Sequence, residues 1–257
     1  SACPRAVPVT WVAALLVVGV AGFLTGMTGF GFSVLSVPLL LILYPPHDVV
    51  VMALCLVPLT SALLLLTPHL RGKLDRRLCL TLTGFSLIGL PIGLVMFHWF
   101  DPVWVSALIG VALVGYAWYG LFADREWSAR HAWLVPSGIL GGILATSTGL
   151  SGPAVAMYVH GRRLTNGEQV ATMAAYVGLV SLIGLGLLAV RGEVGSAALG
   201  RVAWLAPSAL VGVAIGRWWA TRQHAIIDRV TLYALGAMGL WTVARASFVW
   251  ISGGGSS

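Results

Sequence analysis

The stretch TSTGLSGPAVAMYVHG, residues 146–161, interrupts a long apolar region of the chain. The apolar run 132–149 precedes it, and the piece that follows the interruption, 151–161, would rise only ~16 Å as a helix. That is about half of the ~30 Å hydrocarbon core of a bilayer. Gly149 and Gly152 permit irregular backbone, and Pro153 suits the first turn of a helix. The stretch predicts a half-length helix that begins inside a membrane.

A second stretch with the same organisation lies 120 residues earlier in the chain. Residues 25–33 read TGMTGFGFS, with Pro38 further on. At this offset Asp48 also falls on Glu168, and the other matches are Gly22, Leu24, Thr28, Gly29, Val50, Val57, Leu59 and Ser61 on Gly142, Leu144, Thr148, Gly149, Val170, Val177, Leu179 and Ser181. Each half then has a long run, a Thr-Gly break, a short piece, a run that begins at an acid, and two more runs.

This organisation predicts an all-α integral membrane protein of two repeats, 8–122 and 132–251. Because each repeat has an odd number of segments, five, the repeats are expected to be inverted relative to each other, as in many transporters. Residues 252–257, SGGGSS, are interpreted as an added flexible tail without a function.

The composition agrees with a bilayer as the solvent. Hydrophobic residues make up 58% and charged residues 9% of the 257 residues, whereas soluble domains carry roughly a quarter charged residues. The net charge of +7 comes from Lys and Arg between apolar runs, so no nucleic-acid partner is predicted; such a partner would need a basic soluble face with aromatic residues. The three cysteines form no CxxC pattern, which argues against a disulfide framework and a metal site.

Ten apolar segments reach or approach the length of a membrane crossing. They are 8–27, 30–45, 48–67, 78–99, 102–122, 132–149, 151–161, 168–190, 198–219 and 229–251. If all ten cross, one side holds Arg71, Lys73, Arg76, Arg77, Arg125, Arg130, Arg162, Arg163, Arg217, Arg222 and Arg229, and the other holds Arg5, Arg191, Arg201 and Arg245. We expect a multi-pass protein of the bacterial inner membrane; since the basic side is cytoplasmic, both termini are predicted to lie in the periplasm. If 30–45 and 151–161 re-enter instead, the division is about ten to five, and this alternative stays open.

The two breaks predict a binding site for a small anion. No Asp, Glu, Lys or Arg lies centrally in an apolar run, which argues against a carboxylate cage for cations or a buried proton relay. Helix N-termini attract anions, and hydroxyls flank both breaks. The predicted substrate-binding residues are Thr28, Gly29, Phe30, Gly31, Ser33, Ser147, Thr148, Gly149, Ser151 and Gly152. Asp48 and Glu168 are predicted as caps of helix starts, with gating or coupling as the alternative; no catalytic residue, metal or cofactor is predicted.

In these stretches the chain resembles the TauE/SafE family of membrane permeases. The resemblance is carried by GMTGFGFSVLSVPLL at 26–40 and TGLSGPAVAMYVHGRRLTNGEQVAT at 148–172. The second stretch is similar to the family's Gly-Ser-Gly-Pro entry into a half-helix. The first departs from the Gly-Gly-Gly run common in the family, because Phe30 and Phe32 add bulk that could narrow or reshape the site. The resemblance implies transport of sulfite or short organosulfonates such as sulfoacetate, usually outward and without ATP hydrolysis.

Two other functions compete with a transporter. An anion channel would also use inverted repeats and paired broken helices. A rhomboid-type intramembrane serine protease is suggested by Gly149-Leu150-Ser151-Gly152, which fits a GxSG nucleophile motif. Such a serine needs a general base within hydrogen-bond reach, and downstream of Ser151 only His160 and His224 are present. A transporter, with lipid and possible homodimer contacts as its partners, is therefore favoured over an enzyme.

Overall fold

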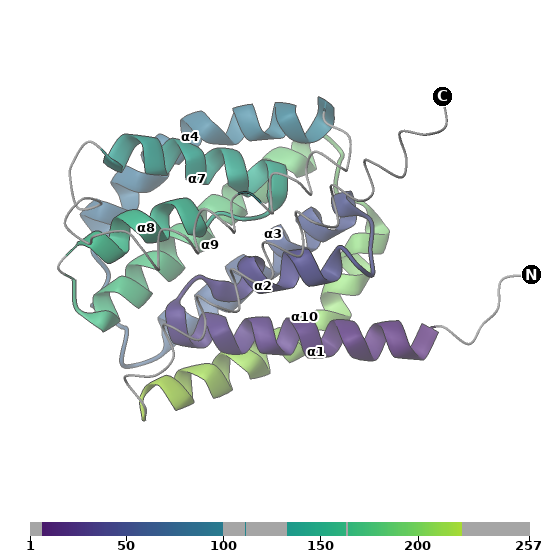
Figure 1. The fold of residues 1–257 in the computed structure, drawn as a ribbon, viewed down its shortest axis with the longest axis horizontal. Coiled ribbons are helices and arrows are strands. Elements are labelled where there is room, and N and C mark those ends of the chain that lie inside the picture. The colour runs from purple at the N-terminus through teal and green to yellow at the C-terminus, as the bar shows by residue number, and fades with distance from the viewer. Residues whose placement is uncertain (1–6, 100–110, 112–132, 163, 223–257) are drawn as a thin grey trace, which may run out of the picture.

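The computed structural model describes residues 7–99, 111, 133–162 and 164–222. Within these residues the chain forms eight α-helices and no strand (Figure 1). The helices are α1 (Val7–Thr28), α2 (Gly31–Leu40), α3 (Pro46–Leu66), α4 (Arg76–Trp99), α7 (Leu134–Thr148), α8 (Pro153–Gly161), α9 (Asn166–Val190) and α10 (Ser196–Ala220). They correspond to eight of the ten predicted segments. The other two, 102–122 apart from residue 111 and 229–251, and the tail 252–257 lie outside the described residues.

Five of these helices are long and apolar enough to cross a membrane, namely α1, α3, α4, α9 and α10. The helices that follow the two breaks are short, with 10 residues in α2 and 9 in α8. In the predicted segment 30–45 the helix ends at Leu40. A tight turn follows it, in which the Leu43 N–H donates to the Leu40 carbonyl over 2.9 Å. Pro45 and Pro46 then begin α3. The segment is therefore shorter as a helix than its apolar run suggests.

Two helix pairs are held together by glycine. Helix α1 packs along α10, and a Cβ built on Gly22 would meet the carbonyl oxygen of Ala209. Helix α4 packs along α7 in the same way, where a Cβ on Gly142 would meet the carbonyl oxygen of Ser86. Such close backbone approach through small residues is how membrane helices associate without a hydrophobic driving force.

Helices α3 and α9 pack against each other and run in opposite directions. Midway along α9, Gly178 lies against Ser61 of α3. At one end, Lys73, which follows α3, lies against Gly167 at the start of α9. At the other end, Glu193, which follows α9, contacts His47 at the start of α3, with 2.8 Å between Oε2 and Nε2. Each of the two helices thus begins where the other ends.

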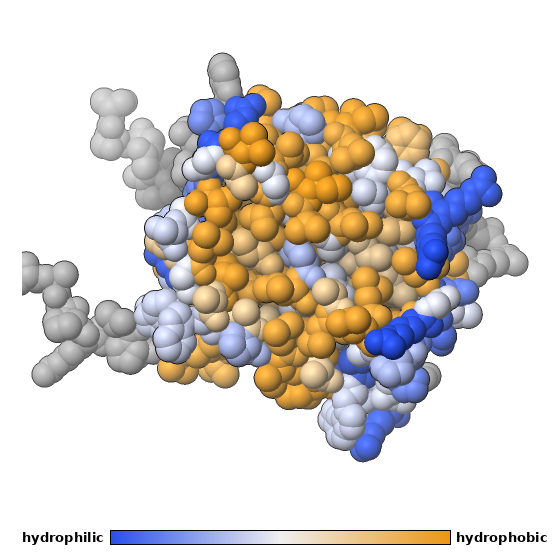
Figure 2. Space-filling model, turned by 180° about the vertical axis from the view of Figure 1, so that it is seen from behind, coloured by the Kyte–Doolittle hydropathy of each residue, from blue (hydrophilic) through white to orange (hydrophobic). Residues whose placement is uncertain are grey.

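The outer surface of the helices is apolar. Figure 2 shows a broad hydrophobic face with hydrophilic residues gathered toward its edges. Large exposed side chains on this surface include Leu16 of α1, Leu80 of α4 and Trp204 of α10, which is 73% exposed. A contiguous apolar exterior of this kind is stable in lipid and would associate in water. The protein is therefore a multi-pass membrane protein.

Contacts between polar groups tie helix ends together at the end of the molecule where α3 begins. Glu193 contacts both His47 and His98, the latter with 3.2 Å between Oε1 and Nδ1. The hydrogen bond with His47, more than that with His98, holds the pKa of the Glu193 carboxyl below its ordinary value. Asp48 forms an ion pair with Arg201 of α10, whose guanidinium lies over the Tyr44 ring at 4.9 Å. These contacts join α3 and α4 to α10 and to the loop that precedes it.

Candidate functional site: two glycine breaks

The first break follows α1. Its last residue, Thr28, precedes Gly29, which has φ +87°, a left-handed conformation that glycine adopts at little cost. A Cβ on Gly29 would also lie 2.6 Å from the carbonyl oxygen of Val170 in α9. Glycine is thus required at position 29 both by its backbone conformation and by the close approach of α9.

The second break repeats this arrangement at the end of α7. Gly149 has φ +76°, and its N–H donates to the Ala145 carbonyl over 3.1 Å. A Cβ there would lie 3.2 Å from Cβ of Ala53 and 3.7 Å from Cα of Val50, both in α3. The first break is therefore covered by α9 and the second by α3, each from the opposite half of the sequence.

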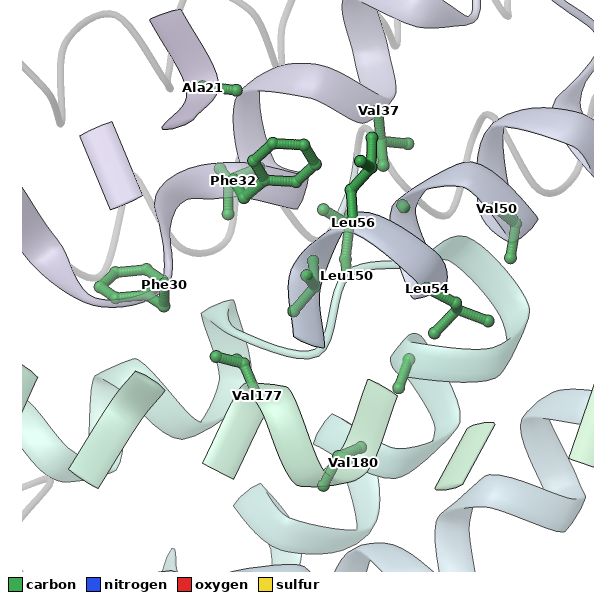
Figure 3. Packing of buried hydrophobic residues seen from close by; sticks show 14 of the residues in the cluster. Ala21, Phe30, Phe32, Val37, Val50, Leu54, Leu56, Leu150, Val177 and Val180 are labelled. Atoms are coloured by element: carbon green, nitrogen blue, oxygen red, sulfur yellow. The ribbon is translucent and has the colours of Figure 1, made fainter. Parts of the chain in front are cut away.

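The two breaks contact each other through Phe30. A Cβ built on Gly152, just before α8, would lie 2.8 Å from Cδ2 of the Phe30 ring. The same ring packs edge to face on His160, with centroids 6.1 Å apart. Figure 3 shows Phe30, Phe32 and Leu150 in one cluster with side chains of α3 and α9. The predicted meeting of residues 28–33 with 147–152 is thus present as a contact, and apolar side chains fill it.

Hydroxyl groups at the breaks are mostly engaged within their own helices. Thr28 donates to the Leu24 carbonyl over 2.9 Å, Ser147 to the Ile143 carbonyl over 2.7 Å, and Thr148 to the Leu144 carbonyl over 2.7 Å. Each bond runs back four residues, as serine and threonine often do in helices. These three hydroxyls were predicted as donors to an anion, but in this conformation their protons point to backbone carbonyls. Donating to a ligand would require rotation about χ1.

The start of α8 offers the donors that remain. The N–H groups of Ser151 and Gly152 make no backbone hydrogen bond within the described part of the chain, as expected just before a helix start. The Ser151 side chain is fully buried, and its Oγ lies 3.5 Å from Oγ of Ser181 in α9. Ser33 is buried near the start of α2, and Gly31 is the first residue of that helix. A helix start carries partial positive charge that favours an anion.

Sequence reasoning missed three residues that complete this arrangement. Val50 and Val170 cover the breaks, and Ser181 faces Ser151. All three belong to residue pairs that match at the 120-residue offset. That match therefore carries a signal for the site as well as for a repeat.

The two acids predicted at helix starts contact other groups. Asp48, in the first turn of α3, forms the ion pair with Arg201. Glu168 completes a capping box at the start of α9, accepting from the Thr165 N–H over 2.8 Å while its own N–H donates to Thr165 Oγ1 over 3.4 Å. Such a capping box stabilises the first turn of a helix. The contacts of Glu168 agree with the predicted cap, whereas Asp48 joins two helices.

The described residues do not assemble the parts of a serine protease. The hydrogen-bond partner of the Ser151 hydroxyl is Ser181, and His160 donates from Nδ1 to the Ala156 carbonyl over 2.8 Å. A nucleophilic serine requires a base at hydrogen-bond distance, and within the described part of the chain no histidine has that position. In the same residues, no group of His, Cys, Asp and Glu side chains could hold a metal ion.

These features define a class of protein: a multi-pass membrane protein with two interrupted helices that contact each other in its interior. The family described as sulfite exporter TauE/SafE matches residues 14–242, and the chain belongs to this family. The family predicted from the residues at the two breaks is thereby confirmed, and the match covers most of the chain. Comparisons with curated proteins and with solved structures gave no match.

Proposed function

We propose that the protein is a secondary transporter that exports sulfite or a short organosulfonate by alternating access around the two breaks. The observation that carries the proposal is the crosswise arrangement of the breaks, in which Gly29 rests on α9 and Gly149 on α3. Sliding or rocking of one half against the other would change the contact of Gly29 with α9 and that of Gly149 with α3 at the same time. Membership of the sulfite exporter family supports the chemistry of the substrate.

We further propose that the two halves are inverted repeats of five segments each. The antiparallel packing of α3 and α9, the third helix of each half, supports this. The left-handed glycines support it as well, because Gly29 and Gly72 recur as Gly149 and Gly192 at the same offset. In inverted-repeat transporters the substrate lies at the repeat interface, near the bilayer midplane.

A site of neutral donors suits a sulfonate or sulfite that must be released. These anions present three oxygen acceptors, and the breaks offer N–H groups at Ser151 and Gly152 together with hydroxyls such as Ser33 and Ser151. No charged residue lies at either break. A buried arginine bound to the anion would make stronger, charge-assisted bonds and would slow its release.

Flux into proteoliposomes tests the proposed substrate. Sulfite, sulfoacetate, taurine, sulfate and simple carboxylates would be compared, and we expect saturable flux of sulfite or a short sulfonate. Ser151→Ala should weaken apparent affinity by about tenfold, the value of roughly one hydrogen bond to a charged group. Thr148→Val should have a smaller effect, since that hydroxyl donates to Leu144. Flux of none of the sulfur anions, or non-saturable flux typical of a channel, would contradict the proposal.

The distribution of charge supports an orientation in the membrane. The end where α4 and α9 begin carries Arg71, Lys73, Arg76, Arg77, Arg162, Arg217 and Arg222, and the opposite end carries Arg191 and Arg201. By the positive-inside rule the first end is cytoplasmic, so both termini would face the periplasm. The inner membrane of a bacterium is the proposed location.

Cysteine labelling in intact cells tests this orientation. With the three native cysteines replaced by alanine, Arg191→Cys should react with a membrane-impermeant maleimide from outside. Arg76→Cys should react only after the cells are opened. Labelling of position 76 in intact cells would rule out the proposed orientation, and the two positions serve as controls for each other.

A further inference from the structure

Ser61 of α3 has a buried hydroxyl group. The residue is 2% exposed, and within the described part of the chain its Oγ makes no hydrogen bond. A helical serine usually donates to the carbonyl four residues earlier, here that of Val57. That carbonyl already accepts the Thr60 hydroxyl over 2.9 Å. A buried polar group left without a hydrogen bond destabilises a protein, so the serine at position 61 does not improve the fold.

The place of Ser61 relates it to the second break. Ser61 lies against Gly178, where a Cβ would be 3.3 Å from the Ser61 Oγ. Three residues further along α9 comes Ser181, on the same face of the helix, and its Oγ lies 3.5 Å from that of Ser151. Three hydroxyls, those of Ser61, Ser181 and Ser151, therefore follow the contact between α3 and α9 to the start of α8. We call these three residues the serine seam.

The serine seam adds hydroxyl donors to those that the breaks offer. The hydroxyls of Thr28, Ser147 and Thr148 are engaged by carbonyls of their own helices, whereas Ser61 has no acceptor among the residues that the structure describes. Among the same residues, Ser151 and Ser181 have only each other at 3.5 Å, a distance at the weak limit of a hydrogen bond. An oxyanion would supply the missing acceptor oxygens to all three.

We propose that Ser61 and Ser181 contact the transported anion, so that its site extends from the start of α8 along the contact between α3 and α9. This inference rests on the proposed function and deepens it by naming two substrate-binding residues outside the breaks. Ser61 and Ser181 occupy equivalent positions in the two halves, one on each of the helices that cover the breaks. Relative movement of α3 and α9 during transport would therefore change the contacts of the anion directly.

Ser61→Ala and Ser181→Ala test the proposal through two separate properties. Purified protein is heated in detergent with and without sulfite, and sulfite flux is measured in proteoliposomes. Without ligand, Ser61→Ala should melt at the same temperature as the parent or higher, because it removes an unpartnered buried hydroxyl. Its apparent affinity for sulfite should nevertheless fall about tenfold, the loss of one hydrogen bond to a charged ligand, and stabilisation by sulfite should shrink. Ser181→Ala should show the same fall in affinity.

Thr60→Val is the matched control. Thr60 is the neighbour of Ser61, is equally buried, and donates its hydroxyl to the Leu56 and Val57 carbonyls of its own helix. Its replacement should lower the melting temperature slightly and leave the affinity for sulfite unchanged. If Ser61→Ala and Ser181→Ala bind and move sulfite like the parent, the serine seam is only a packing feature and the inference is overturned. A parent that moves none of the sulfur anions would overturn the proposed function, and the inference with it.

Discussion

Replacement of Gly142 by alanine is expected to destabilise the protein severely. Gly142 lies in the middle of α7, where a Cβ would meet the Ser86 carbonyl oxygen and come within 3.0 Å of the Leu90 nitrogen, both in α4. These are backbone atoms of a packed helix, so no side-chain rotation can make room. The two helices would have to separate along their contact, and forcing extra methyl groups into tight packing costs ~1–3 kcal/mol or more. We expect Gly142→Ala to reach the upper part of that range.

Gly84→Ala provides the matched control for this prediction. Gly84 lies in α4 on its exposed face, and a Cβ there would meet none of the described residues within 4 Å. Alanine in an open helical position is favoured over glycine by roughly 0.5–1 kcal/mol, so this variant should be as stable as the parent or more so. The melting temperature and the yield of monodisperse protein in detergent measure both variants. Equal stability of Gly142→Ala and Gly84→Ala would show that α4 and α7 do not pack as described.

Gly152→Val should abolish transport, and Phe30→Ala should restore part of it. Gly152 has φ −81° and ψ −48°, a conformation open to any residue, so the obstacle to a side chain there is the Phe30 ring at 2.8 Å. A valine at 152 would displace this ring from the contact between the two breaks. Because the closest obstacle is the ring, shortening Phe30 to alanine removes it and leaves only the Cβ of residue 30, at 3.3 Å. Contacting residues typically show coupling of ~0.5–3 kcal/mol in such a cycle.

Initial rates of sulfite flux measure this cycle in the parent, the two single variants and the double variant. Gly152→Val should reduce the rate by more than tenfold, and the double variant should recover to near the rate of Phe30→Ala alone. Phe30→Ala alone should also improve the flux of longer sulfonates relative to sulfite, since it removes bulk beside both breaks. A double variant no better than Gly152→Val would contradict the contact between the breaks.

Sequence by itself determined the membrane class, the number of the described helices, the two breaks and, except for the end of α2 at Leu40, the approximate helix limits. These features are local: a run of apolar residues, a Thr-Gly pair or a Pro at a helix start acts through the backbone within a few residues. Gly29 and Gly149 are examples, because their positive φ follows from the breaks that were read from the sequence. The family was also recognised from the residues around these two breaks.

Only the tertiary structure decided which groups face one another across the protein. Close contacts at glycines set how α1 packs on α10 and how α4 packs on α7. The repeat offset alone does not identify those helix partners. The predicted donors Thr28, Ser147 and Thr148 were assigned to the anion by residue type, yet each carbonyl four residues earlier competes for the same proton. Ser61 differs from these three residues, because its hydroxyl has no partner among the described residues. The Val57 carbonyl, four residues before Ser61, accepts the Thr60 hydroxyl instead. A hydroxyl's role depends on the acceptors around it: its own helix supplies the nearby carbonyls, and packing decides which groups of other helices lie beside it, as Ser181 lies beside Ser151.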